Sequence, residues 1–176
     1  MRLEAEGGAR SIPPFLSPYQ DLAEQLCHAC KRHYGTRLVS VALFGSVARG
    51  TPQFDSDLDV LIVADDLAQG RMKRAREFER IEAALAPTLD SMRLSGIAVE
   101  LSPVFKTPAE IEQGSPLLLD MTEDAHILYD RAGFLAQALA SLSARLGRLG
   151  ARRIWLGSAW YWDLKPDFRA GEVIEL

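Results

Sequence analysis

Leu38-Val-Ser-Val-Ala-Leu-Phe-Gly-Ser-Val-Ala-Arg-Gly50, followed after six residues by Asp57-Leu-Asp-Val-Leu-Ile-Val63, is the stretch that decides the fold. Its first half is an apolar run rich in β-branched and aromatic residues, which predicts a buried strand over 38–45. The run stops abruptly at a Gly-Ser pair. We expect Ser46 to cap a short helix whose free N–H groups form a site for a phosphate-sized anion.

Two aspartates open the second half of this stretch. Because side chains alternate along a strand, Asp57 and Asp59 should point to one side while Leu58 points to the other. Such a pair is often only a solvated strand edge, but the unbroken apolar run that follows favours a central strand over 57–64. Neighbouring carboxylates repel each other unless a cation compensates them, and Mg²⁺ binds one or two carboxylates together with substrate phosphates. The anion site and the metal site together predict a nucleoside triphosphate site.

The segments Phe44 to Gly50 and Ser56 to Val63 resemble the polymerase-beta-like nucleotidyltransferases, and in particular the small prokaryotic minimal nucleotidyltransferases. The resemblance implies an α/β (α+β) fold, in which a mixed β-sheet palm is flanked by helices. It also implies a third carboxylate on a neighbouring strand. The sequence offers Glu100, within the apolar stretch 96–105, where members of the family more often carry Asp. The alternative is a solvent-facing strand position.

The resemblance further implies which residues perform the transfer of a nucleoside monophosphate. Asp57, Asp59 and Glu100 are the expected catalytic residues and the ligands of two Mg²⁺ ions, and ATP is the expected substrate. Glu100 could equally accept the proton of the attacking hydroxyl. The expected nucleotide-binding residues are Gly45, Ser46 and Arg49, although Arg49 could instead be a solvated turn residue.

Length and composition limit the class of protein. With 176 residues and 48% hydrophobic composition, the chain can form one compact domain with a sizeable core. A formal net charge of -4 does not suggest a protein that binds nucleic acid non-specifically. The sequence has no apolar run of about 18 residues and no basic-then-apolar leader, so we expect no membrane segment and a cytoplasmic location.

The rest of the chain divides into three expected parts. These are a loose N-terminal arm over 1–16, a nucleotidyltransferase domain over 17–150, and an aromatic C-terminal segment over 151–176. Hydrophobic periodicity and Pro or Ser starts predict helices over 17–35, 69–92, 115–122 and 134–149, and a further strand over 125–130.

A small cluster of metal-binding residue types lies in the first expected helix. Cys27, Cys30 and His33 could suggest zinc or a redox dithiol, but they drift around the helix and no second group of ligands completes a tetrahedral site. We therefore expect reduced thiols near the core.

The C-terminal segment has an unusual density of rigid aromatic residues. Trp155, Trp160, Tyr161 and Trp162 lie within eight residues, a composition suited either to a protein interface or to an arm that packs on its own domain. The resemblance implies a small helical HEPN protein as partner, with AMP attached to its tyrosine in the manner of a type VII-like antitoxin. Two alternatives are a non-catalytic binder that neutralises a HEPN partner by contact, and a transferase acting on an aminoglycoside-like small molecule.

Overall fold

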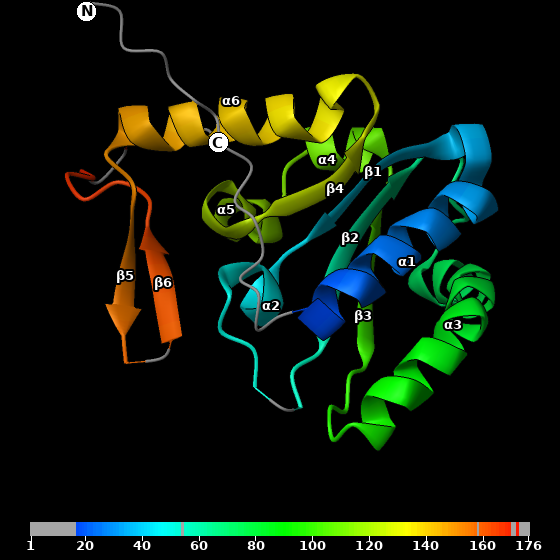
Figure 1. The fold of residues 1–176 in the computed structure, drawn as a ribbon. Coiled ribbons are helices and arrows are strands. Elements are labelled where there is room, and N and C mark those ends of the chain that lie inside the picture. The colour runs from blue at the N-terminus through cyan, green and yellow to red at the C-terminus, as the bar shows by residue number, and fades with distance from the viewer. Residues whose placement is uncertain (1–16, 54, 158, 170–171, 173–176) are drawn as a thin grey trace, which may run out of the picture.

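The computed structural model describes residues 17–53, 55–157, 159–169 and 172 (Figure 1). The expected arm over 1–16 lies outside these residues. Within the described part of the chain, no helix is long and apolar enough to cross a membrane.

A four-stranded mixed sheet forms the centre of the fold (Figure 1). Its strand order is β3-β2-β1-β4; β1 is antiparallel to β2 and to β4, whereas β2 and β3 run parallel. The strands are β1 (Leu38–Leu43), β2 (Leu58–Ala64), β3 (Leu101–Lys106) and β4 (His126–Asp130). This arrangement confirms the mixed sheet flanked by helices, and it places β2 between two other strands, as its unbroken apolar sequence predicted.

Helices cover both faces of this sheet (Figure 1). They are α1 (Ser17–Tyr34), the short α2 (Gly45–Arg49), α3 (Arg71–Leu94), α4 (Pro108–Glu112), α5 (Pro116–Asp124) and α6 (Phe134–Leu149), with short 3-10 turns η2 (Gly35–Arg37) and η3 (Arg131–Gly133). In β2, Leu58 and Val60 pack with α1 and α3, whereas Leu61 and Val63 pack with α4, α5 and α6. Alternation along one strand therefore builds two apolar layers, and Asp59 lies on the α5 and α6 side with Leu61.

The first part of the expected aromatic C-terminal segment forms a two-stranded antiparallel hairpin. It consists of β5 (Arg152–Leu156) and β6 (Ala159–Asp163), and Figure 1 shows it beside α2 and α5, separate from the main sheet. An isolated hairpin of this size is marginally stable in water. Its position therefore depends on side-chain contacts with α5.

Candidate active site

The turn after β1 brings the backbone against a carboxylate of β2. Gly45 has a φ of +73°, a left-handed conformation that favours glycine. A Cβ atom built at this position would overlap Oδ2 of Asp59 and lie 2.9 Å from its Cγ. Only a residue without a side chain allows this approach. Gly50, at φ +77°, then ends α2, and the N–H of Thr51 donates to the carbonyl of Ser46 at 2.9 Å.

The expectation that Ser46 caps this short helix is wrong. The N-cap residue is Phe44, and no side chain caps the helix. The left-handed backbone of Gly45 turns the chain into α2 two residues earlier than expected, so Ser46 lies within its first turn. The hydroxyl-bearing residue nevertheless borders the cavity in which the other predicted residues meet.

Asp57 and Asp59 share one cavity with the residues predicted to bind phosphate. Asp59 lies in β2, and Asp57 comes immediately before the strand. A cavity of about 410 Å³ is lined by both aspartates together with Gly45, Ser46 and Arg49. The structure thus brings together five of the six predicted site residues.

The electrostatic environment of Asp59 disfavours its ionised form. Burial raises the pKa of the Asp59 carboxyl, and the negative charge of Asp57 raises it further. A hydrogen bond with the Ser102 side chain and the positive charge of Arg49 act in the opposite direction. Ser102 was missed by the sequence analysis. It pairs with Asp59 in the parallel register between β2 and β3, so its side chain lies on the same side of the sheet.

Glu100 does not lie inside an apolar strand, and this part of the prediction is wrong. Its side chain is exposed, and it directly precedes β3, which is an edge strand of the sheet. Its carbonyl accepts a hydrogen bond from the N–H of Leu58 at 2.8 Å, which places the Glu100 backbone beside the start of β2. An exposed glutamate needs no buried partner.

The two aspartates fit a divalent cation that prefers oxygen ligands. Across the residues that the structure describes, no group of three or more His, Cys, Asp or Glu side chains is gathered closely enough to hold a metal ion. Asp57 and Asp59 alone nevertheless supply carboxylate oxygens that border one cavity. Burial, and then the charge of Asp57, raise the pKa of Asp59, and a bound cation would favour its ionised form. Two carboxylates with room left for phosphate and water are a common donor set for Mg²⁺.

Arg49 is held between a carboxylate and an aromatic ring. Its Nη1 lies 3.6 Å from Oδ2 of Asp124, and its guanidinium carbon lies 4.7 Å from the centroid of the Trp160 ring. Its side chain is only 22% exposed. Arg49 is therefore a positioned, half-buried cation at the edge of the cavity, rather than a freely solvated turn residue.

The cavity also contains residues that the sequence analysis did not assign to a site. Its lining is completed by Phe44, by Leu117 and Asp120 of α5, and by Trp160 of β6. Asp120 Oδ1 accepts hydrogen bonds from the indole N–H groups of Trp160 at 2.7 Å and of Trp162 at 2.9 Å. The density of tryptophan in the sequence was the available signal, but local sequence does not show which helix the aromatic residues contact.

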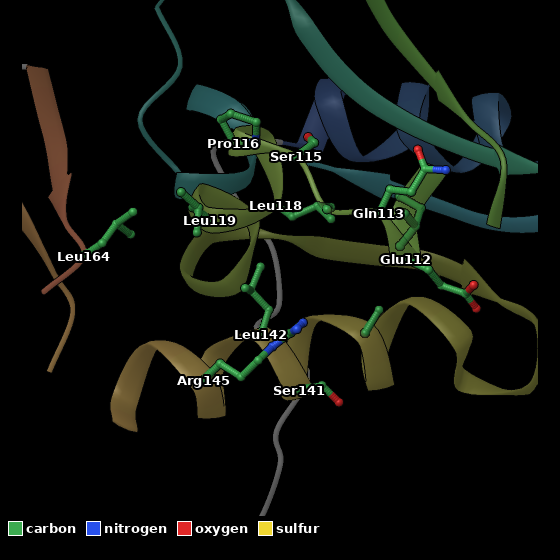
Figure 2. Close-up of a pocket in the computed structure, with 13 residues that line it drawn as sticks. Glu112, Gln113, Ser115, Pro116, Leu118, Leu119, Ser141, Leu142, Arg145 and Leu164 are labelled. Carbon is green, nitrogen blue, oxygen red and sulfur yellow. The ribbon is translucent and has the colours of Figure 1, made fainter. Parts of the chain in front are cut away.

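A second cavity, of about 540 Å³, lies between α5 and α6 and contains none of the predicted site residues. Figure 2 shows Leu118 and Leu119 of α5 facing Leu142 and Arg145 of α6. Its lining is mostly apolar and lacks paired carboxylates. The chemistry expected of a nucleotide site therefore belongs to the cavity at Asp57 and Asp59.

The chain has recognisable relatives among known proteins. The chain matches the model of the family described as a nucleotidyltransferase domain over residues 23–129. This match includes β1, α2, β2, β3 and all six predicted site residues, and it ends before α6 and the β5–β6 hairpin.

One curated relative is a Methanocaldococcus jannaschii protein provisionally named a protein adenylyltransferase. It is 29% identical over 131 residues, which cover 73% of this chain and 84% of the relative.

Solved structures with a similar arrangement were also found. One is a toxin-antitoxin crystal structure with AMP-PNP, at 17% identity and a TM-score of 0.44, covering 72% of this chain and 92% of that chain. Another is a spectinomycin adenyltransferase of Enterococcus faecialis with ATP and spectinomycin, at 13% identity and a TM-score of 0.49, covering 72% and 66%. A third is a tri-AMPylated HEPN toxin with an MNT antitoxin from Shewanella oneidensis, at 15% identity and a TM-score of 0.41, covering 74% and 92%.

Proposed function

Because this chain belongs to the nucleotidyltransferase domain family and is a nucleotidyltransferase, we propose that it transfers AMP from ATP to a tyrosine hydroxyl of a small helical HEPN protein. In this proposal the chain acts as a type VII-like antitoxin. The observation that carries the transfer chemistry is the close approach of the Gly45 turn to the Asp59 carboxylate, in a cavity that Ser46, Arg49 and Asp57 also line.

The roles of the residues follow from their positions around the cavity. Asp57 and Asp59 would hold Mg²⁺, and Glu100, beside the start of β2, is the proposed third carboxylate. A bound Mg²⁺ offsets the negative charge that develops on the phosphate oxygens. Arg49 and the Ser46 hydroxyl border the same cavity and would bind the leaving pyrophosphate.

The transfer itself is an in-line displacement. The tyrosine oxygen forms a bond to the α-phosphorus of ATP. The bond between the α-phosphorus and the oxygen that bridges it to the β-phosphorus breaks, and pyrophosphate leaves. The proton of the tyrosine hydroxyl must be accepted as the bond forms. The exposed carboxylate of Glu100 is the proposed acceptor of this proton.

Two observations support a protein acceptor over an aminoglycoside-like one. The relative from Methanocaldococcus jannaschii carries the name of a protein adenylyltransferase. In addition, acidic side chains that could form a pocket for a polycation are paired within the chain: Glu110 binds Arg74, at 2.8 Å, and Asp124 binds Arg153, at 2.9 Å. Such pairs leave less negative charge for a cationic substrate.

The test uses the full chain with a neighbouring gene product that carries the Arg-x4-6-His signature of a HEPN nuclease. We expect that ATP and Mg²⁺ add AMP to a partner tyrosine, as measured by intact mass and peptide mapping. The double variant Asp57→Ala with Asp59→Ala should add none, whereas Asp21→Ala, which removes a carboxylate from the exposed side of α1, should behave like the wild type.

Three outcomes would contradict parts of this proposal. Full activity of the double variant would remove the aspartates from the mechanism. Neutralisation of the partner by the double variant, without AMP transfer, would favour the contact-only binder. AMP transfer to small hydroxyl compounds but not to the partner, in a substrate screen, would favour the small-molecule transferase.

A further inference from the structure

The hairpin beyond the family match reaches the candidate active site. The match ends at residue 129, whereas Trp160 of β6 lines the cavity that contains Asp57 and Asp59. We infer that Trp155 and Trp160 form a stacking surface for the base of the nucleoside triphosphate. This inference rests on the proposed function, since it assigns the base-binding part of the same site.

The register of the hairpin puts the tryptophans on the face directed at the site. Trp155 pairs with Trp160, and Arg153 pairs with Trp162, so these four side chains share one face. The opposite face carries Ile154 paired with Tyr161. The Trp155 and Trp160 ring centroids lie 5.0 Å apart at an interplanar angle of 51°.

The hairpin is anchored to α5 by polar contacts that orient these rings. Asp120 accepts both indole N–H groups of Trp160 and Trp162. Arg153 donates to Oδ2 of Asp124 at 2.9 Å and to the carbonyl of Asp120 at 3.2 Å. Asp120 thus contacts the hairpin through both its side chain and its backbone carbonyl. These contacts hold the Trp160 ring in place before any ligand binds.

A further cavity adjoins the one at the aspartates. It has a volume of about 470 Å³ and shares Ser46, Arg49 and Trp160 with the first cavity, and it adds Trp155 as a second aromatic wall. Binding cavities for small molecules are commonly of this size. A nucleotide whose phosphates contact Arg49 can therefore reach the aromatic pair without leaving the site.

The chemistry of this adjoining cavity suits a flat heterocycle. Trp155 is 53% exposed, so a large aromatic surface faces water that a ligand could displace. Gln53 and Asp55, also on the lining, offer amide and carboxylate groups that can pair with the edge of a base. Stacking on an aromatic ring and pairing at the edge are the two common ways in which proteins bind bases.

The test compares two ligands that differ in the nucleoside. Isothermal titration calorimetry measures the affinity of the full chain for ATP and for inorganic tripolyphosphate, each with MgCl₂. We expect Trp155→Ala to weaken ATP binding by roughly 5- to 150-fold and to leave tripolyphosphate binding unchanged. Trp155→Phe should retain most of the ATP affinity, because it keeps an aromatic face.

Two control variants separate stacking from other effects. Tyr161→Ala removes a ring that is 52% exposed on the opposite face of the same hairpin, and it should change neither affinity. Arg49→Ala should weaken both ligands, because Arg49 borders both cavities. Circular dichroism of each variant checks that the chain is folded.

Each result decides a different point. If the wild-type protein binds neither ligand, the proposed function fails. If the wild-type protein binds ATP and tripolyphosphate with equal affinity, only the inferred stacking surface is overturned, and this result is obtained without any variant. Unchanged ATP affinity in a folded Trp155→Ala variant also overturns it. If that variant binds ATP normally but transfers AMP poorly, the aromatic pair contacts the acceptor rather than the base.

Discussion

Gly45 is the residue at which backbone conformation and site geometry depend on each other most closely. Its φ is +73°, and a Cβ would overlap the Asp59 carboxylate. We expect Gly45→Ala to displace Asp59 and to reduce AMP transfer by about 100-fold, since misplacement of a catalytic group by about 1 Å can have an effect of this size. A left-handed alanine should also lower the free energy of unfolding by about 1 to 3 kcal/mol. Transfer kinetics and urea unfolding measure the two effects.

Gly35→Ala is the matched control for this change. Gly35 also has a positive φ, of +55°, but a Cβ there meets nothing within 4 Å. The control should lose stability while retaining transfer activity. An active Gly45→Ala variant would show that close approach of the turn to Asp59 is not required.

Asp59 should make the stability of the chain depend on pH. Burial and the charge of Asp57 raise its pKa in the folded state. This carboxyl therefore stabilises the fold most below its unfolded pKa, and the contribution is lost as pH rises through the higher folded value. We expect Asp59→Asn to have a higher urea midpoint than wild type at pH 7, with a difference that shrinks as pH falls toward about 4.

The comparison needs a variant with the same change in net charge. Asp21→Asn removes one negative charge from an exposed position on α1. Its midpoint should follow that of the wild type across the pH range. A neutral-pH midpoint of Asp59→Asn at or below the wild-type value would contradict the raised pKa.

At the scale of elements, apolar patterns predicted the long helices and the four central strands, but they missed α4 and the hairpin. The five-residue α4 is too short for periodicity; its signal was the box formed by Thr107 and Glu110, whose side chains bond each other's backbone N–H groups. The hairpin has no alternation of apolar and polar residues, because Trp160 and Trp162 contact α5 on one face while Ile154 and Tyr161 lie on the other. Its position depends on Asp120, which is distant in sequence.

The attachment of the hairpin to α5 can be tested at Asp120. Asp120→Ala would leave the indole N–H groups of Trp160 and Trp162 without their acceptor. We expect the hairpin to detach from α5 more often, which should shift tryptophan emission to the red and speed protease cleavage within 151–163. The free energy of unfolding should fall by about 1 to 3 kcal/mol. Fluorescence, limited proteolysis and urea unfolding measure these changes.

Two further variants make the interpretation specific. Asp120→Asn keeps a carbonyl acceptor and should have a smaller effect. Asp163→Ala removes a hairpin carboxylate whose contact with Arg152 is long, at 4.0 Å, and partly exposed, so it should change little. Equal effects of Asp120→Ala and Asp163→Ala would show that Asp120 does not hold the hairpin.

For the whole molecule, the sequence located the part of the site that is local in the chain. The spacing from Gly45 to Asp59 lies within one strand-turn-strand unit, and these residues line one cavity. Three other elements supply Ser102, Asp120 and Trp160. Only the pairing of β2 with β3, and the packing of the sheet against α5 and the hairpin, bring these residues close to Asp59 and Arg49. Glu100 was placed incorrectly because apolar neighbours do not reveal that β3 is an edge strand.

The sheet also separates the candidate site from the two cysteines. Cys27 and Cys30 are free thiols on α1, buried at 6% and 0% exposure in the layer shared with α3, as the helical pattern predicted. Asp59 instead lies with the layer of α5 and α6. Burial raises the pKa of the Cys30 thiol to about 12 and also raises that of Cys27, so little reactive thiolate forms near pH 8.

We therefore expect a thiol reagent to leave the folded protein unmodified and its transfer activity unchanged. An aromatic disulfide that releases a coloured thiolate on exchange should label fewer than about 0.1 thiols per folded chain within minutes. In urea it should label both cysteines, because only unfolding exposes them. Ala75→Cys, at an exposed position on α3, provides a positive control that should react at once in the folded state. Rapid labelling of wild-type thiols under native conditions would mean that α1 opens readily. Loss of transfer activity on labelling would mean that the α1 layer and the site at Asp59 are coupled rather than separated by the sheet.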